Sequence, residues 1–421
     1  MVPGVNILFL TENFPPETNA AATRVYERAL YWVKWGHRVT VLTSAPNFPH
    51  GRLFPGWENR WRQIEQRDGI RVVRVKTYIA ANEGFARRTL DFVSFMASAW
   101  VAGLLERRPD VVVATSPQFF AAIGGWALAA AVRRPFVFEL GDLWPRSITA
   151  VGAMADSPVI RALEAVELFL YRRSAAVAAL THAFKADLVG RGIPAEKIAV
   201  VINGVDLPRY APRPRDADLA AAWGLTGKFV VGYVGTHGMA HGLVNVLDAA
   251  EATRGDPTLR FLFVGAGAER QMLKDEAARR RLDNVVFADP QPKEMMPRVW
   301  SVCDAALVHL KDSPAFAEVI PSKIFEAMGM GLPILLVSPE GEASRIVLDD
   351  GAGIWVPAAR PESLAAAARS LMTDRNQFRR LAAASLAAAP RHSRERQAES
   401  FIRVLELAAS GRGGTAGTVE S

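Results

Sequence analysis

Short apolar runs alternate with stretches of helical spacing along nearly the whole chain, and this alternation constrains the fold more than any other feature. Strands that alternate with helices are joined by crossover connections, so they form a parallel sheet with helices on both faces. The first half therefore predicts a doubly wound α/β domain. Its expected strands are residues 6–10, 38–43, 71–75, 111–115, 136–140, 175–180 and 198–202.

The alternation is interrupted and then restarts, which predicts a second domain of the same kind. Residues 206–218 carry three prolines and several charges. The strands expected after this segment are residues 229–234, 260–264, 285–288, 305–309 and 333–337. A chain of 421 residues is also long enough to split into two cores.

These boundaries give a domain plan. We expect an N-terminal Rossmann-like domain over residues 1–205, a linker over 206–218 and a C-terminal Rossmann-like domain over 219–390. Residues 391–409 are expected to form a C-terminal helix that could pack back on the first domain. Residues 410–421 are rich in Gly, Ser and Thr and are expected to be disordered. Because ligands of open parallel sheets bind beyond the carboxyl ends of the strands, we expect the two domains to face each other across a cleft.

Charge and cysteine content exclude some functions. The 50 basic and 43 acidic residues give a net charge of +7, which favours anionic partners. The arginines are scattered through helices and no nucleic-acid-binding motif accompanies them, so we expect no nucleic acid partner. The single cysteine, Cys303, excludes a disulfide within the chain and a multi-cysteine metal site. We expect it to be a small buried hydrophobic residue.

Two segments bear on the relation to membranes. Residues 1–11 lead into an apolar strand without a charged leader or a cleavage site, so we expect a cytoplasmic protein. The uncharged run 92–105 has fourteen residues. As a helix it spans about 21 Å, against roughly 30 Å of hydrocarbon. It lies between Arg87-Arg88 and Arg107-Arg108, so it either packs in the core or lies in a membrane interface.

The most informative stretch runs from Glu318 to Glu326, two carboxylates separated by seven residues. Proline suits a first helical turn, so Pro321 predicts a helix start. The amides of Ser322, Lys323 and Ile324 would then point outward and could bind an anionic diphosphate. Lys323 would add a point charge, Glu318 could bind sugar hydroxyls, and Glu326 could bind a ribose. The alternative is an ordinary surface helix with two solvated glutamates.

Other stretches carry weaker signals. The glycines of Gly235-Thr-His237-Gly238-Met-Ala-His241-Gly242 would let backbone approach a diphosphate closely. Each histidine could instead be a solvated loop residue. Asp142 follows the strand 136–140 and could orient an acceptor hydroxyl or take its proton, or it could cap a short helical turn.

Taken together, these motifs resemble family 4 of the retaining glycosyltransferases, which have the GT-B fold. The Glu-x7-Glu spacing carries the resemblance, which covers roughly residues 5–390. It is supported by Phe14-Pro15-Pro16 with Ala21, Ala22 and Arg24, by Gly36-His-Arg-Val-Thr-Val41, by Asn203-Gly-Val-Asp206 and by Val264-Gly-Ala-Gly267. Most of the family carries an arginine and a lysine in the loop where this chain has His237 and His241.

The resemblance implies a nucleotide-sugar donor, most simply a UDP-sugar, with no cofactor and no metal. Asp142, Glu318 and Lys323 are the expected catalytic residues. Donor contacts are expected from Gly235, His237, Gly238, His241, Gly265, Gly267, Pro290, Ser322, Lys323, Ile324 and Glu326. Acceptor contacts are expected from a loop over residues 13–24, through Asn13, Ala21, Ala22 and Arg24, and from Trp144. Arg24 would meet phosphate, or else form a surface salt bridge.

Phe14-Pro15-Pro16 with Asp142-Leu-Trp144-Pro is most similar to a bacterial branch that includes fucosamine transferases of surface polysaccharide synthesis. That branch often has an arginine before the aspartate, where this chain has Gly141. The similarity implies an N-acetylated hexosamine or deoxyhexosamine donor, a lipid-linked glycan acceptor, and peripheral contact with the inner face of the cytoplasmic membrane. A soluble small-molecule acceptor, a GT-B sugar-nucleotide epimerase and an inactive binding partner of another transferase remain alternatives.

Overall fold

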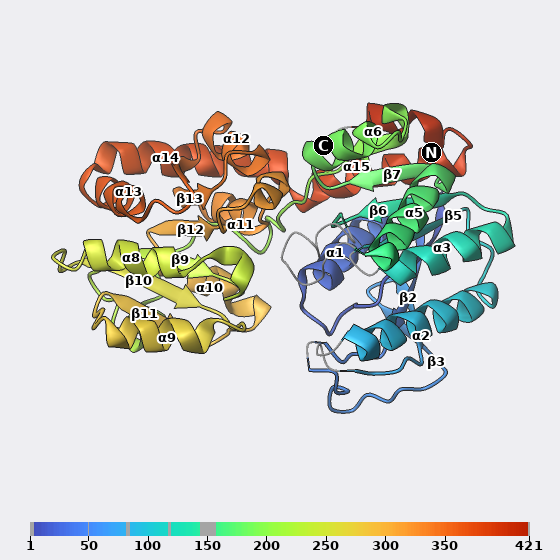
Figure 1. Ribbon diagram of the computed structural model, residues 1–421, viewed down its shortest axis with the longest axis horizontal. Coiled ribbons are helices and arrows are strands. Elements are labelled where there is room, and N and C mark those ends of the chain that lie inside the picture. The colour runs from blue at the N-terminus through green and yellow to red at the C-terminus, as the bar shows by residue number, and fades with distance from the viewer. Residues whose placement is uncertain (1–3, 49, 81–84, 117–118, 144–156, 420–421) are drawn as a thin grey trace. The chain divides into compact units, whose positions relative to one another are not determined.

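The computed structural model describes residues 4–48, 50–80, 85–116, 119–143 and 157–419 (Figure 1). The chain divides into two compact units. The N-terminal unit comprises Met1–Asn203 together with Arg394–Ser421, and the C-terminal unit comprises Gly204–Ser393. Each unit is an α/β domain built on its own sheet, as the alternation of strands and helices predicts.

The N-terminal unit has an eight-stranded sheet in the order β3-β4-β2-β1-β5-β6-β7-β8. All neighbours are parallel except β3 and β4. The antiparallel edge strand β3 was not predicted, because its sequence RQIEQR is almost entirely polar. The strands are β1 (Asn6–Leu10), β2 (Arg38–Ser44), β3 (Arg62–Arg67), β4 (Ile70–Val75), β5 (Val111–Thr115), β6 (Phe136–Leu140), β7 (Ala176–Ala179) and β8 (Ile198–Val200).

Two hydrophobic cores cover the two faces of this sheet. Successive side chains of a strand point to opposite faces, so Leu8 packs in one core and Phe9 in the other. The first core includes α2 (Phe85–Leu104), α3 (Phe119–Val132) and α5 (Pro158–Arg173), and the second includes α1 (Ala20–Lys34) and α15 (Arg394–Ala409). A further helix, α6 (His182–Gly190), follows β7.

The C-terminal unit has a six-stranded, fully parallel sheet in the order β11-β10-β9-β12-β13-β14. Its strands are β9 (Phe229–Val234), β10 (Leu259–Val264), β11 (Val285–Ala288), β12 (Ala305–His309), β13 (Ile334–Ser338) and β14 (Gly353–Pro357). The edge strand β14 was also not predicted. Its helices are α7 (Ala217–Ala222), α8 (Val244–Ala252), α9 (Arg270–Arg279), α10 (Met296–Ser301), α11 (Lys323–Met330), α12 (Glu342–Asp349), α13 (Pro361–Thr373) and α14 (Arg375–Ala388).

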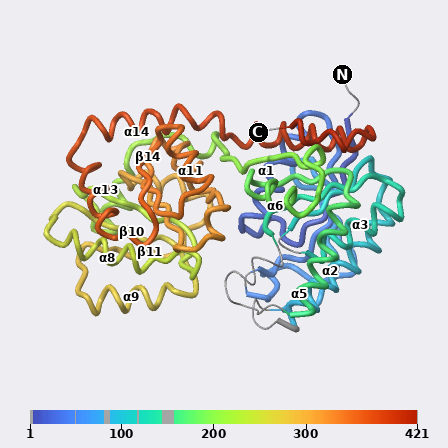
Figure 2. Tube along the Cα trace, turned by 45° about the horizontal axis from the view of Figure 1, so that its top comes forward, coloured from blue at the N-terminus to red at the C-terminus, as the bar shows by residue number. Residues whose placement is uncertain are grey.

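The C-terminal helix α15 packs on the N-terminal unit, against α1, although the two helices are far apart in the sequence (Figure 2). The indole Nε1 of Trp32 on α1 donates to the carbonyl of Ala398 at 2.9 Å. The Trp32 ring stacks on Phe401 with 5.6 Å between centroids. The sheet of this unit is therefore covered on one face by the two ends of the chain.

The structure adds two details to the domain plan. Residues 410–419, expected to be disordered, are ordered: a 3-10 helix over Gly413–Thr418 buries Ala416, and a Cβ on Gly413 would lie 2.6 Å from the Ala175 carbonyl oxygen. The segment 206–218, expected as a linker, packs within the C-terminal unit. Tyr210 is buried, and Arg215 pairs with Asp304 at 3.0 Å within the C-terminal unit. Small residues in the tail and charges in the segment suggested solvent, but close backbone packing and ion pairs fix both.

None of the helices in the described parts of the chain is long and apolar enough to cross a membrane. The helix α2 contains the apolar run 92–105 up to Leu104 and buries Phe95, Ala99 and Ala102. Its remaining apolar side chains are considered below.

Candidate active site

Two glycine loops follow the first two central strands of the C-terminal unit and lie against each other. Gly235 follows β9 with φ +141°, and Gly265 follows β10 with φ +145°. The Gly235 amide donates to the Val264 carbonyl at 2.9 Å. A Cβ on Gly265 would lie 2.0 Å from the Gly235 carbonyl oxygen, so only glycine fits there. Because these glycines have no side chain, the backbone of both loops is uncovered at the carboxyl edge of the sheet.

Backbone hydrogen bonds also join the residues that follow Gly235 and Gly265. The His237 amide donates to the Ala266 carbonyl at 2.8 Å, and the Glu269 amide donates to the His237 carbonyl at 3.0 Å. Gly267 has φ +155°, and a Cβ there would lie 2.2 Å from the His237 carbonyl oxygen. The predicted donor residues Gly235, Gly265 and Gly267 are therefore close together, and the fold requires glycine at each.

Lys323 brings a positive charge to these loops. It is the first residue of α11, and its Nζ lies 3.9 Å from the centroid of the Tyr233 ring and 2.9 Å from where a Cβ on Gly235 would be. The nitrogen is buried and has no hydrogen-bond partner among the described residues. Burial lowers the Lys323 pKa to about 8, although nearby Glu326 opposes this. Among the described residues, the ammonium contacts the face of the Tyr233 ring but forms no hydrogen bond to a carboxylate oxygen.

The start of α11 offers fewer amides than predicted. The Ile324 amide donates to the Pro321 carbonyl at 3.1 Å, and the Ile324 side chain is fully buried. Ile324 therefore cannot serve as a donor contact, because the first turn closes on itself. Ser322 takes the N-cap position with no side-chain cap. The set of amides that could meet a ligand is reduced to those of Ser322 and Lys323.

The two glutamates of the Glu-x7-Glu motif are both partly exposed. Glu326 lies on α11, and its Oε2 accepts from the Trp300 indole Nε1 at 3.0 Å. Glu318 ends a 3-10 helix over Pro314–Glu318. This turn packs against Gly341, where a Cβ would lie 2.1 Å from the Ala317 carbonyl oxygen. Trp300 and Gly341 were not singled out in the sequence, because neither belongs to a local motif.

The histidines of the glycine loop have different environments. The His237 ring is fully buried beside Tyr233, Phe263 and Phe287, with ring centroids 5.8, 5.9 and 6.5 Å away. It is neither a solvated loop residue nor exposed to a ligand, because the aromatic residues enclose it. His241 is partly exposed and contacts His309, the last residue of β12.

Two other predicted donor residues lie around this group. Gly238 precedes a 3-10 helix over Met239–His241, and a Cβ there would meet only Thr236. Pro290 is exposed in the loop after β11.

The predicted acceptor loop of the N-terminal unit ends earlier than expected. Helix α1 begins at Ala20, and the Asn19 side chain caps it by accepting from the Ala22 amide at 2.9 Å. Ala21 is partly exposed in the first turn, whereas Ala22 is fully buried with its amide engaged, which argues against a direct role for Ala22 in binding. The loop itself is short, and the Asn13 carbonyl accepts from the Thr11 hydroxyl at 3.1 Å.

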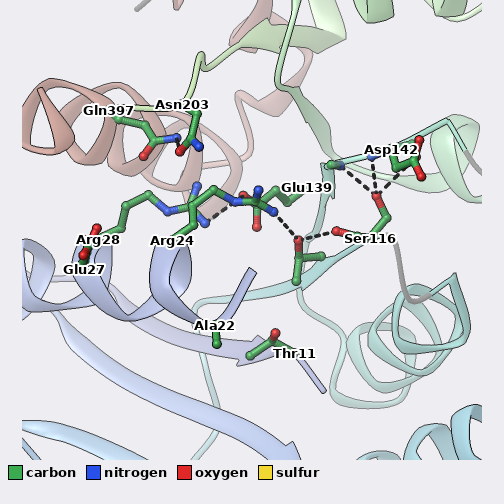
Figure 3. A network of polar contacts seen from close by, with 12 residues as sticks. Thr11, Ala22, Arg24, Glu27, Arg28, Ser116, Glu139, Asp142, Asn203 and Gln397 are labelled. Atoms are coloured by element: carbon green, nitrogen blue, oxygen red, sulfur yellow. Dashed lines mark hydrogen bonds and ion pairs between the residues drawn. The ribbon is translucent and has the colours of Figure 1, made fainter. Parts of the chain in front are cut away.

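Arg24 is buried in an ion network instead of facing solvent (Figure 3). Its Nε pairs with Glu139 Oε1 at 3.1 Å, and its NH2 group donates to the Thr115 hydroxyl at 3.3 Å. Arg28 pairs with the same carboxylate at 2.8 Å. Although burial opposes it, Arg28 and Arg24 keep the pKa of Glu139 below its usual value. Arg24 therefore forms a buried salt bridge, neither the surface one nor the phosphate contact expected.

The same network continues to Asp142, which is partly exposed (Figure 3). The Ser116 hydroxyl oxygen accepts from the amides of Gly141 and Asp142 at 2.8 and 3.3 Å. A Cβ on Gly141 would lie 2.7 Å from the Ser116 carbonyl oxygen and 3.2 Å from the Arg24 NH2 group. Glycine is therefore favoured at position 141, because the Ser116 backbone and the Arg24 NH2 group occupy the space that a Cβ would need. Trp144 lies outside the described residues.

The described residues contain no group of three or more His, Cys, Asp or Glu side chains placed to hold a metal ion. Cys303 is buried, and burial raises the pKa of its thiol. The structure gives this thiol a packing role: a Cβ on Gly232 would lie 2.2 Å from its sulfur.

Comparison with known proteins identifies both units. The family described as "Glycosyl transferase 4-like domain" matches residues 19–204, and "Glycosyl transferases group 1" matches residues 218–386. The putative colanic acid biosynthesis glycosyl transferase WcaI of Escherichia coli is 25% identical over 78% of this chain and 82% of its own. A GDP-mannose-dependent alpha-mannosyltransferase of Mycobacterium tuberculosis is 24% identical over 84% of each.

Solved structures agree on the architecture. Sucrose-phosphate synthase of Thermosynechococcus elongatus superposes with a TM-score of 0.77 at 17% identity, covering 96% of this chain and 99% of that one. HepE of Anabaena, solved in complex with UDP, gives a TM-score of 0.70 at 20% identity, covering 95% and 99%. The two sheets and these neighbours define the GT-B fold. The chain is a glycosyltransferase, built from a glycosyl transferase 4-like domain and a group 1 domain.

Proposed function

We propose that this enzyme transfers a sugar from a UDP-sugar to a lipid-linked glycan acceptor in bacterial surface polysaccharide synthesis. The observation that carries the proposal is the Lys323 ammonium, buried beside the bared backbone of Gly235 with no hydrogen-bond partner among the described residues. A buried charge without a partner is costly, and a diphosphate oxygen would satisfy it. UDP bound to HepE and the name of WcaI support the donor class and the pathway.

In the proposed mechanism the donor diphosphate lies against the loops at Gly235 and Gly265. Cleavage of the sugar–phosphate bond builds negative charge on the leaving diphosphate. Lys323 and the amides at the start of α11 stabilise that charge more in the transition state than in the ground state. Glu326, held by Trp300, binds the ribose hydroxyls, and Glu318 binds the sugar. Retention of the anomeric configuration follows from the resemblance to family 4.

For the acceptor, we propose that Asp142 orients the attacking hydroxyl. The Ser116 hydroxyl fixes the backbone of residues 141 and 142, and the buried Arg24–Glu139 pair lies beneath them. Rigid support of this kind keeps a catalytic group within the narrow geometry that chemistry requires. The donor sugar is proposed to be an N-acetylated hexosamine or deoxyhexosamine.

A membrane-facing surface on α2 fits a lipid-linked acceptor. Trp100, Val101 and Leu104 are 36%, 39% and 42% exposed, although the opposite side of the helix is buried. Arginines at both ends of this apolar run are exposed, namely Arg87, Arg88, Arg107 and Arg108. Apolar side chains flanked by cations suit the interface of an anionic membrane, which is where we propose the enzyme works.

A transfer assay tests the donor site. Purified enzyme is incubated with a panel of UDP-sugars and with membranes that contain lipid-linked glycan, and UDP release is measured. Lys323→Met should lower kcat by about 100-fold or more, on the scale of losing one charge-stabilising donor. Glu326→Gln should mainly weaken nucleotide binding, by about 1–3 kcal/mol. Lys274→Met, an exposed lysine of α9, serves as the matched control.

Three outcomes of this assay decide against the proposal or part of it. Unchanged turnover in Lys323→Met would remove Lys323 from the mechanism. Interconversion of the nucleotide sugar without any acceptor would indicate an epimerase. We further propose that no divalent ion is needed, so activity should persist in a chelator; loss that magnesium or manganese reverses would contradict this.

A further inference from the structure

His241 and His309 bind each other's backbone. The Nδ1 of His309 lies 2.6 Å from the His241 carbonyl oxygen, and the Nδ1 of His241 lies 3.3 Å from the His309 carbonyl oxygen. A carbonyl oxygen only accepts hydrogen bonds, so both Nδ1 atoms carry a proton. This reciprocal clasp fixes the tautomer of neutral His241: its Nε2 carries the lone pair and is the nitrogen left to meet a ligand.

The charged groups around His241 are mostly cationic. Lys323 acts on it from α11, and the Tyr233 ring of β9 lies 5.9 Å away, centroid to centroid. His309 faces it from β12 and is itself buried, and its Nε2 lies 3.0 Å from the Asn245 side-chain Oδ1. Because the neutral ring already carries its proton on Nδ1, the Asn245 amide must be turned so that its NH2 group donates to Nε2. Within the glycine loop, His241 also acts on His237, which lies near Arg270 of α9. Two carboxylates lie at the margin: Glu326 acts on Lys323, and Glu269 acts on Tyr233.

This environment keeps His241 neutral before a ligand arrives. Burial, with Lys323 adding to it, lowers the pKa of His241 to about 4. Burial similarly lowers the pKa of His309 to about 4. An anion bound beside Lys323 would reverse the sign of the local field, and a nearby opposite charge favours the protonated imidazole.

Resting on the proposed function, we infer that His241 takes up one proton from water when a nucleoside diphosphate binds and donates its Nε2–H to the diphosphate. The bond formed is N–H and the bond broken is that of a buffer acid, which replaces the proton taken from water, and the imidazolium balances one negative charge of the ligand. A lysine, which most of the resembled family has in this loop, would already carry its charge and would take up no proton. Donor binding in this enzyme is therefore coupled to pH through the clasped histidine.

Calorimetry tests the coupling without any turnover. Binding of UDP, GDP and ADP to the full-length protein is measured at pH 6.5 in PIPES and in Bis-Tris, whose ionisation enthalpies differ. The difference in binding enthalpy between the buffers gives the protons taken up. The terminal phosphate of the nucleotide, with a pKa near 6, itself releases part of a proton on binding at pH 6.5, so the wild type should take up about 0.5–1 proton more than a variant without the His241 imidazole.

Matched variants assign that proton. His241→Asn keeps a side-chain amide that can donate to the His309 carbonyl but removes Nε2, so the number of protons taken up should fall by about 0.5–1. His241→Lys should show the same decrease and a flatter dependence of affinity on pH. His50→Gln removes an exposed histidine elsewhere and should behave as the wild type. Thermal melts of each variant confirm that it is folded.

The outcomes separate this inference from the function on which it rests. Equal proton exchange in the wild type and in His241→Asn would overturn the role of His241 and leave the donor site intact. Failure of all three nucleotides to bind would overturn the proposed function and this inference with it. A second phase of uptake above pH 8 that survives in His241→Asn is expected from Lys323 and does not count against His241.

Discussion

At the residue scale, the two units differ in whether their buried charged side chains form ion pairs. In the N-terminal unit, Arg24 and Arg28 share the carboxylate of Glu139, and all three side chains are at least nine-tenths buried. Arg394 from α15 pairs with Glu27 at 3.0 Å. In the C-terminal unit, the described residues give the Lys323 ammonium a ring face and the nearby Glu326 to offset its burial, and no ion pair. Paired charges support the structure, whereas the unpaired ammonium is the reason we propose a binding site here.

The burial of Lys323 should be visible in stability. Its folded-state pKa of about 8 lies below the unfolded value of 10.5, so the unfolded chain binds more protons between these pH values. Stability contributed by this group therefore rises with pH across that window. Lys323→Met should be more stable than the wild type at pH 7, and the gap should shrink between pH 8 and pH 10.5.

Thermal denaturation of both proteins across this pH range measures the gap. Lys274→Met, from the exposed face of α9, should show no such pH-dependent difference. A gap that stays constant with pH would mean that the Lys323 ammonium is not desolvated as the structure indicates.

At the scale of elements, the neighbouring helices α2 and α3 differ in how much of their apolar surface is covered. Helix α3 lies against α2 and β5 and is enclosed by neighbours. Helix α2 buries Phe95 and Ala99 but leaves Trp100 and Leu104 in solvent. Its N-terminal Arg88 rests on the Phe92 ring at 5.5 Å, which keeps the guanidinium near the apolar surface. The exposed side of α2 is thus built from apolar side chains with cations at its ends.

Vesicle flotation tests the proposed membrane surface. The protein should bind anionic vesicles at low salt and be partly released at high salt, because part of the attraction is screened. Trp100→Glu and Arg87→Glu with Arg88→Glu should each reduce binding. Trp61→Glu, on a tryptophan that is 48% exposed near β3, is the matched control. Equal binding by the Trp100 and Trp61 variants, or no binding at low salt, would contradict the proposal.

At the scale of the whole molecule, the N-terminal unit is discontinuous. One face of its sheet is covered by α15, which follows the C-terminal unit in the sequence. Two chain segments pass between the units and pair with each other through a bridge between Val205 and Ser393. The C-terminal unit, by contrast, is one continuous stretch.

Ending the chain after Ser393 should therefore damage one unit alone. Removal of α15 uncovers Trp32 and Arg28 and leaves Glu27 without Arg394. We expect the N-terminal unit to unfold at a lower temperature or to aggregate, while nucleotide still binds. Phe401→Ala should cost about 3–5 kcal/mol through the cavity it leaves, and Phe48→Ala, at a side chain 37% exposed, far less.

Calorimetric unfolding measures both effects, with nucleotide titration as the readout for the C-terminal unit. An unchanged unfolding temperature of the truncated chain would show that α15 does not stabilise the N-terminal unit. Simultaneous loss of nucleotide binding would show that the two units do not fold independently.

Much of the architecture could be read from the sequence because it depends on local order. Buried parallel strands are continuous apolar runs, so twelve strands were predicted close to their observed bounds. The two strands missed, β3 and β14, lie at sheet edges. The first is almost entirely polar, and the second, GIWVP, begins with Gly and ends with Pro, which are residues typical of turns. The glycines at 235, 265 and 267 could be identified because a loop that must bare its backbone tolerates no side chain.

The sequence alone determined the two α/β domains and the loops that carry the candidate site, and it predicted the role of Lys323. Only the tertiary structure decided how each polar side chain is used. Arg24 is buried against Glu139, 115 residues away, and His237 is enclosed by aromatic rings from three strands. His241 acquired its tautomer from His309, 68 residues away. Strand and helix patterns repeat within a few residues, whereas hydrogen-bond partners and burial depend on segments that meet only when the chain has folded.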